Sequence, residues 1–461
     1  MLFAIRYYKL MQIMKIYPFK SIGKRGLYCL FLSASVGSVN AQNDDNATMR
    51  LSLNEAIRYA KESNKLVGVL KTEEKATQAD LEDAKMGAFP RITSNASYQR
   101  YTKVTLYHDV LGESHSIPKP PSYNAGGLNV EAAFNLYAGG RQRYAVTDQK
   151  YKGELACINT NEQEANIGLQ VALQYLDMIR IYFQERLIKD QITRAESRLK
   201  NINAFYTNGK VTKSDLLRAE VVLSNVHLGE TSNRNDYGIS NQRLNTLLNL
   251  NESVKIIPVD TTSLGLPDSV TFASLLKEYP GTYAILKAQK NIEIQENRVA
   301  LAKSANLPTI ALFGGYGFNY PNTLVFPPVA QTFAVGLIGV RLSYDISSLY
   351  QNKNKVRSAT IRAAELKQQK DWIQDNVAQE VRALAVKYNE AVERMLVVKK
   401  TIEQTEVNYD IQNTKYANQL SLLTDLLDAD NLYQESRYNY IQANIAALSI
   451  YYRLLFITGK L

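Results

Sequence analysis

The sequence of 461 residues contains very little cysteine, histidine and tryptophan. Two cysteines exclude a disulfide-rich scaffold and most zinc modules. Three histidines leave little scope for metal binding or acid–base catalysis by imidazole. Twelve prolines and 23 glycines are too few for a low-complexity chain, and a hydrophobic fraction of 45% argues against disorder. The length suits two or three domains or one long one.

The net charge of +10 at first suggests a nucleic-acid partner. Six of the 54 basic residues, however, lie in residues 1–41, which contain no acid, so the rest of the chain holds 48 basic against 44 acidic residues. That small excess is spread thinly along the sequence. We therefore exclude nucleic acid as a partner.

Residues 1–41 have the pattern of an export signal. A basic stretch at residues 20–25 precedes an apolar core at residues 27–36 and the small-residue cleavage site Val39-Asn40-Ala41. Removal of this signal, with Cys29, would leave Cys157 as the one cysteine of the mature chain. No later run of 18 apolar residues occurs. We expect an exported protein that is periplasmic, secreted or an outer-membrane barrel.

The remaining sequence contains an internal repeat. Residues 208–219 (NGKVTKSDLLRA) and 418–429 (NQLSLLTDLLDA) share five identities in twelve at an offset of 210. The repeat predicts a first structural unit at residues 42–250, a linker at 251–270 and a second unit at 271–461.

Each unit is predicted to contain the same elements in the same order: a helix, two strands, a very long helix and a return helix. The periodic and proline-poor segments that carry this prediction are, in the first unit, 51–89, 91–103, 128–137, 141–205 and 213–250, and in the second, 272–307, 310–320, 334–345, 352–416 and 422–458. A helix of 60-odd residues spans about 90–100 Å and is typical of a coiled coil.

Four strands of 10–13 residues with one apolar face suit a tilted membrane barrel, but four strands cannot close one. Two chains would supply eight strands and three would supply twelve; because side chains fill an eight-stranded lumen, a conduit favours three. The alternative is a small soluble sheet that caps a helical bundle.

With these elements in place, the chain resembles the TolC family of outer-membrane efflux proteins. Residues 134–141 (FNLYAGGR) resemble the family's exit from the second strand into the long helix, whereas the second copy, residues 344–350 (YDISSLY), lacks both glycines. The two repeated motifs resemble the family's periplasmic hairpin tips, and residues 437–461 resemble its last helix. The resemblance covers residues 51–461.

The resemblance implies a mixed α and β membrane protein: a homotrimer with one twelve-stranded outer-membrane barrel, continued by a long periplasmic α-helical coiled-coil barrel. Most of the mass would lie in the periplasm. It further implies a passive exit duct of a tripartite efflux or type I secretion system, opened when an inner-membrane pump and a periplasmic adaptor (membrane fusion) protein dock. We expect no enzymatic activity and no cofactor.

Asp425 and Asp428 are three residues apart and share one helix face. Threefold symmetry would turn them into rings of carboxylates that attract cations, although acids in a first helical turn also complement the helix dipole. The resemblance places the aperture acids at these positions. It also places the gating latch at Tyr416, Ser214 and Asp215, whereas Ser421 stands where the family has a gating arginine.

Gly209, Lys210, Gln419 and Leu420 lie in the two tips, where adaptor hairpins dock in relatives. A glycine at 209 is also what a tight turn requires, whatever its partner. Gly139 and Gly140 are expected to let the strand bend into the long helix.

Two other readings stay open at this stage. A soluble periplasmic coiled-coil scaffold would need neither detergent nor a pore, and a duct for proteins in place of small molecules would look the same in sequence. His108 and His115, with acids between them, fit a solvated extracellular loop better than a metal site. No catalytic arrangement of nucleophile, base or paired carboxylates is discernible.

Overall fold

A computed structural model of the chain describes residues 48–102, 105–107, 114–116, 122–260, 265–267, 269–277, 281–322, 324 and 329–461. These residues lie within one compact unit, and the predicted export signal lies outside them. His108 and the acids Asp109 and Glu113 of the predicted loop also lie outside the described residues.

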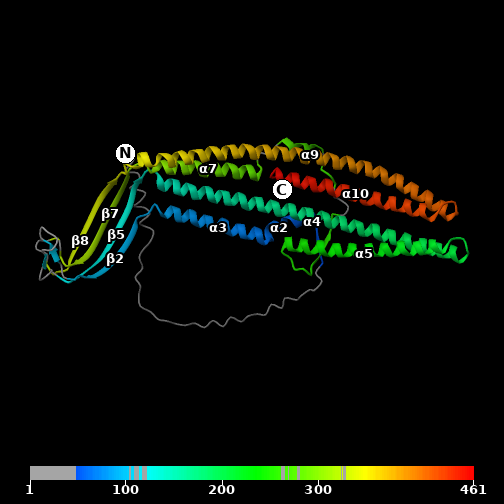
Figure 1. Cartoon of the computed structure of the whole chain (residues 1–461), viewed down its shortest axis with the longest axis horizontal. Helices are drawn as coiled ribbons and strands as arrows, with labels where there is room; N and C mark the ends of the chain where they lie inside the picture. The colour runs from blue at the N-terminus through cyan, green and yellow to red at the C-terminus, as the bar shows by residue number, and fades with distance from the viewer. Residues whose placement is uncertain are drawn as a thin grey trace, which may run out of the picture. The chain divides into compact units, whose positions relative to one another are not determined.

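Four antiparallel strands form one sheet at one end of the long helices (Figure 1). In sheet order they are β2 (Arg91–Arg100), β5 (Asn124–Ala138), β7 (Thr309–Tyr320) and β8 (Phe333–Ser343). Strands from the two halves of the sequence therefore pair at the centre of the sheet, where β5 lies against β7. Among the described residues, the outer edges of β2 and β8 have no partner strand.

The two faces of this sheet differ in polarity because successive side chains of a strand alternate between faces. One face carries exposed apolar side chains, and the register places Val130 opposite Tyr316 and Leu128 opposite Phe318. Ile338, Val340 and Leu342 of the edge strand β8 extend this face. The other face is hollowed and is lined by polar residues that include Arg91, Thr93, Asn129, Glu131 and Arg341.

Six helices account for most of the remaining chain. They are α3 (Lys65–Met86), α4 (Arg141–Thr207), α5 (Lys213–Leu248), α7 (Tyr283–Ser304), α9 (Lys353–Ala417) and α10 (Leu423–Ile457). Near the sheet the packing order is α3-α4-α7-α9, and toward the tips it is α5-α4-α10-α9 (Figure 1). The edge elements are therefore β2, α3 and α5 on one side, and β8 and α9 on the other.

The prediction of one continuous helix at residues 51–89 was wrong. Leu51 ends a short strand, β1 (Thr48–Leu51), and the helical part divides into α2 (Leu53–Ser63) and α3. The break lies at Asn64, whose ψ of 132° is extended. Its side chain is buried, accepts a hydrogen bond from the N–H of Leu66 and donates one to the carbonyl of Leu247. A side chain that competes for backbone groups in this way ends one helix and caps the next.

The second predicted helix, 272–307, also divides, into α6 (Ser269–Lys277) and α7, on either side of the segment that contains Pro280 and Gly281. The predicted linker holds structure as well: β6 (Lys255–Pro258) pairs in parallel with β1. Its Ile256 is fully buried in a core with Tyr175 of α4 and Leu244 of α5. This core fixes the linker against the middle of the long helices.

The two sheet-to-helix junctions are built differently. Gly139 and Gly140 adopt φ of +62° and +82°, and a Cβ at Gly139 would lie 2.7 Å from the carbonyl oxygen of Ser304. Glycine is thus required at that bend. The second junction turns through Asp345, whose carboxylate accepts a hydrogen bond from the N–H of Ser347 at 3.1 Å, before the short helix α8 (Ser348–Gln351). An Asx-type turn replaces the glycine pair that the second copy lacks.

Candidate functional site

The first hairpin tip joins α4 to α5 and is closed by local hydrogen bonds. Gly209 has a φ of +69°, which glycine adopts at little cost. The N–H of Asp215 donates to Oγ1 of Thr212 at 3.2 Å, and the N–H of Thr212 donates to the Asp215 carboxylate at 3.0 Å. This capping box holds the carboxylate of Asp215 within its own hairpin. Lys210 and Ser214 are exposed beside it.

The second tip joins α9 to α10 and has the same backbone conformation. Its residues, however, are less suited to the left-handed turn position and to the helix cap. Gln419 takes the left-handed position, with a φ of +62°. Leu422 precedes α10 and its side chain has no oxygen that could cap the helix. The N–H of Leu422 instead donates a hydrogen bond to the carboxylate of Asp425, at 3.2 Å. The side chains of Leu420 and Leu422 are 76% and 70% exposed. Exposed apolar side chains grouped in this way are typical of a surface that contacts another protein.

Asp425 and Asp428 both lie on the exposed face of the first turns of α10. Asp425 caps the helix, as the helix-dipole alternative requires, whereas Asp428 has no hydrogen bond or ion pair with any described residue. The structure therefore brings the two acids to one solvent-facing surface.

Tyr416 is buried at the end of α9, 9% exposed, in a cluster with Ile202 and Ala219 of the first hairpin and Leu426 of α10. Burial and the negative charge of Asp215 raise the pKa of its hydroxyl, and Arg198 opposes this shift. Among the described residues the hydroxyl has no hydrogen-bond partner. Tyr416 and Asp215 are thus close enough to interact electrostatically, but no hydrogen bond joins their side chains in the single chain.

The sequence did not predict a buried ion cluster that lies two turns after the start of α10. Asp430 is 4% exposed, and its carboxylate contacts Nη2 of Arg198 at 2.5 Å and Nε of Arg194 at 3.2 Å, both on α4. Nη2 of Arg194 and Nη1 of Arg198 are buried without a partner among the described residues. The cluster therefore joins the two hairpins by a charged contact. The signal in the sequence was the Arg-xxx-Arg spacing on one face of the first long helix.

Further contacts between α4 and α10 surround this cluster. Arg437 of α10 contacts Asp190 of α4 at 3.0 Å and lies over the ring of Tyr433, 5.4 Å from its centre. The guanidinium of Arg194 lies 5.8 and 5.9 Å from the ring centres of Tyr409 and Tyr433, which stack on each other. Cation–π contacts of this kind stabilise desolvated arginines. The seam between the two hairpins is therefore held by charge as well as by apolar packing.

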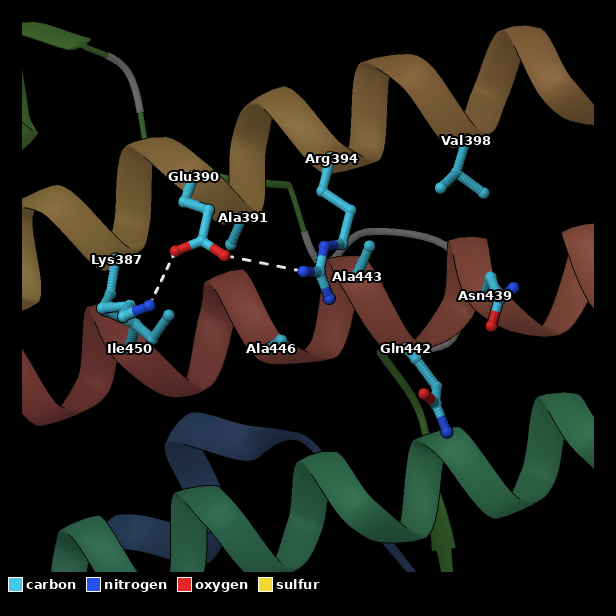
Figure 2. Close-up of a pocket in the computed structure, with 10 residues that line it drawn as sticks. All are labelled: Lys387, Glu390, Ala391, Arg394, Val398, Asn439, Gln442, Ala443, Ala446 and Ile450. Carbon is cyan, nitrogen blue, oxygen red and sulfur yellow. Dashed lines mark hydrogen bonds and ion pairs between the residues drawn. The ribbon is translucent and has the colours of Figure 1, made fainter.

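A groove between α9 and α10 lies nearer the middle of the helices and is shown in Figure 2. Its floor is formed by small residues, Ala391, Ala443 and Ala446, and its rim carries Lys387, Glu390 and Arg394. Glu390 contacts Lys387 at 2.8 Å and Arg394 at 3.5 Å, and the pKa of Glu390 is lowered chiefly by its hydrogen bond with Lys387. The charged groups of this groove satisfy one another, and none is left to bind a ligand.

Two absences bear on the chemistry of the described part of the chain. No group of three or more His, Cys, Asp or Glu side chains there is arranged to hold a metal ion. None of the helices that the structure describes combines the length and the apolar character needed to cross a bilayer.

Comparison with known proteins places these features in a class. The family model described as "Outer membrane efflux protein" matches residues 56–250. The outer membrane protein TolC of Vibrio cholerae serotype O1 is 20% identical over 425 residues, which are 89% of this chain and 92% of that protein.

Solved structures agree with the sequence matches. The outer membrane protein VceC of Vibrio cholerae superposes with a TM-score of 0.72 at 16% identity, covering 88% of this chain and 96% of that one. The outer-membrane channel OprN gives a TM-score of 0.71 at 17% identity, over 88% and 90% of the two chains.

These matches define the class that the chain is similar to: outer-membrane efflux proteins, which are channels and not enzymes and have a large helical part in the periplasm. Within it the chain is a homologue of TolC, so the resemblance seen in the sequence is confirmed. The predicted fold, strands continued by very long helices in two repeats, is confirmed as well.

Proposed function

We propose that three copies of the chain form an exit duct across the outer membrane, the outermost part of a tripartite efflux or type I secretion system. The observation that carries this proposal is the sheet. Its two edge strands lack partners among the described residues, and one of its faces is apolar and exposed. An open edge cannot lie in lipid, and four strands cannot close a barrel. Three copies supply twelve strands, with β8 of one copy against β2 of the next.

The helices support the same assembly because the edge helices α5 and α9 both carry exposed apolar residues. On α5, Leu217, Val221 and Leu228 are 50–69% exposed and are spaced by four and seven. On α9, Val386 and Val397 are 65% and 66% exposed. Apolar residues at such intervals are typical of a coiled-coil seam. In the proposed trimer α5 of one copy packs against α9 of its neighbour and continues the contact between the strand edges.

The hairpin tips would then form the periplasmic entrance. Asp425 and Asp428 of three copies would supply six carboxylates around the axis, which would attract cations and bind multivalent ones. The exposed tip residues Gly209, Lys210, Gln419 and Leu420 are the proposed docking points for the adaptor, which in turn would couple the duct to an inner-membrane pump.

We further propose that the closed state is held mainly by the ion cluster of Asp430 with Arg194 and Arg198. Tyr416 and Asp215, with Ser214 beside them, would contribute a second and weaker contact. The cluster joins the hairpin that carries the aperture acids to its neighbour, and it is more buried than the tip. Opening would separate these charges, which the docked adaptor would have to offset.

Single-channel recording in a planar bilayer tests the proposal. We expect small resting conductance and block by a trivalent cation from the periplasmic side, with block weakened at least tenfold in Asp425→Asn with Asp428→Asn. The matched control is Glu220→Gln, which removes an exposed acid from the return helix of the other hairpin. The trivalent cation should block this variant as strongly as it blocks the wild type. Unchanged block in the double variant would remove these acids from the aperture, and no conductance under any condition would contradict the duct.

A further inference from the structure

A second groove, of about 790 Å³, lies near the sheet, across the helices α4, α7 and α9. Four basic side chains from three helices line it: Arg141 of α4, Arg298 of α7, and Lys355 and Arg362 of α9. The other lining residues are small, apolar or neutral, and include Ala145, Ala302 and Ser358. No acidic side chain is among them, so the lining carries four positive charges.

Several basic residues elsewhere along the same helices are paired with acids. On α7, Lys290 contacts Glu154 of α4 at 2.6 Å, and Lys287 pairs with Glu162 of α4. On α9, Lys367 contacts Glu296 at 2.7 Å. In the groove, by contrast, the side chains of Arg141, Lys355 and Arg362 have no ion pair or hydrogen bond with any residue that the structure describes, although all three line one cavity.

Arg298 alone has an acid nearby, and that acid is shared. Its Nε lies 3.7 Å from Asp148, which also contacts Lys152 at 2.7 Å. The first turns of α4 and α9 contain no acid either, although the positive end of the helix dipole favours one there. Each half of the sequence thus places a basic residue and no acid in the first turn of its long helix. These two basic residues, Arg141 and Lys355, line the same groove.

We propose that this groove binds an anionic group, a phosphate or a carboxylate carried by a small molecule or by a lipid headgroup. A guanidinium group can donate two parallel hydrogen bonds to two oxygens of such an anion. The bound anion would also offset the mutual repulsion of the four basic side chains. The groove lies over α7, which has α4 on one side and α9 on the other within the same chain. The binding does not depend on whether the protein conducts.

Isothermal titration of the detergent-solubilised mature protein with inorganic pyrophosphate at low ionic strength tests this site. We expect saturable binding that weakens at least tenfold in Lys355→Gln with Arg362→Gln. The control, Lys353→Gln with Arg357→Gln, removes the same charge from exposed residues of the same helix that do not line the groove, and should change affinity less than twofold. Arg141→Gln, on another helix, gives a second variant should the first fail to fold.

Equal weakening in test and control variants would show a diffuse charge effect and overturn the proposal, as would absence of saturable binding to the wild type. The source of the anion is decided in nanodiscs. If a headgroup occupies the groove, pyrophosphate binds more weakly in discs that contain phosphatidylglycerol than in discs of phosphatidylcholine alone. If a solute occupies it, the two affinities are equal, and the loss in Lys355→Gln with Arg362→Gln persists in both.

Discussion

The two hairpin tips come from related sequences yet are stabilised in different ways. The first has glycine at its left-handed position and a threonine capping box, both favourable locally. The second has Gln419 and Leu422 at the matching positions and relies on tertiary contacts: the burial of Tyr416, Leu423 and Leu426 and the ion cluster of Asp430. A tip that depends on contacts with its neighbour can be released by changing those contacts, whereas the first tip keeps its form by itself.

The largest expected effect comes from Asp430→Ala. Removing the acid would leave the buried Arg198 and the part-buried Arg194 without this counter-ion, and loss of one partner of a buried pair costs roughly 3–5 kcal/mol. We expect a correspondingly lower free energy of unfolding and a raised resting conductance. The matching position of the first hairpin, Glu220, is exposed, so Glu220→Ala is the control and should change stability by less than about 0.5 kcal/mol. Chemical denaturation measures both free energies of unfolding. Equal losses in the two variants would contradict the proposed difference between the tips.

Next in size is the loss of the helix cap. Thr212→Ala removes the acceptor for the N–H of Asp215 and should cost about 1 kcal/mol. Leu422→Ala at the matching position removes no hydrogen bond and should cost only a few tenths of a kcal/mol. Thermal unfolding of the two variants in the same detergent measures the contrast. A larger loss for Leu422→Ala would mean that the exposed leucine contributes a contact beyond the single chain.

Exchanging the turn residues tests the same contrast in both directions. Gln419→Gly should stabilise by up to about 1 kcal/mol because a side chain in the left-handed region is strained. Gly209→Ala should destabilise by about the same amount. Nothing lies within 4 Å of a Cβ at Gly209, so its loss would report backbone strain alone. Hydrogen exchange at the two tips should show the opposite changes, and parallel changes would refute the account.

The smallest effect is expected for Tyr416→Phe. The hydroxyl makes no hydrogen bond with a described residue, so its removal should change stability by less than about 1 kcal/mol near neutral pH. Because its pKa is raised above the ordinary value of about 10, the tyrosine contributes stability that is full below pH 10 and is lost as the pH rises through the raised pKa. Tyr416→Phe should therefore reduce the alkaline loss of stability, whereas Tyr206→Phe, at an exposed position, should not. A large rise in resting conductance in Tyr416→Phe would instead indicate a bond made in the assembled duct.

The sequence predicted much of the fold because its strongest signals are local. Apolar periodicity and the absence of proline located α4 and α9, and the repeated motif located both tips. It missed the break at Asn64, where one buried amide makes contacts with Leu247, 183 residues away. It missed Asp430 for the same reason, since the partners lie 232 and 236 residues away on another helix. The basic groove near the sheet likewise brings together three helices that no local pattern relates.

The central claim, that the unpartnered sheet edges of one chain are closed by two more chains, is tested most directly by the native mass of the mature protein. The protein should be extracted from an outer-membrane fraction and weighed in detergent by native mass spectrometry. We predict three chains per particle, dependent on detergent. A monomer that stays in solution without detergent would contradict the account, because β2 and β8 would then end the sheet in water and no barrel would form.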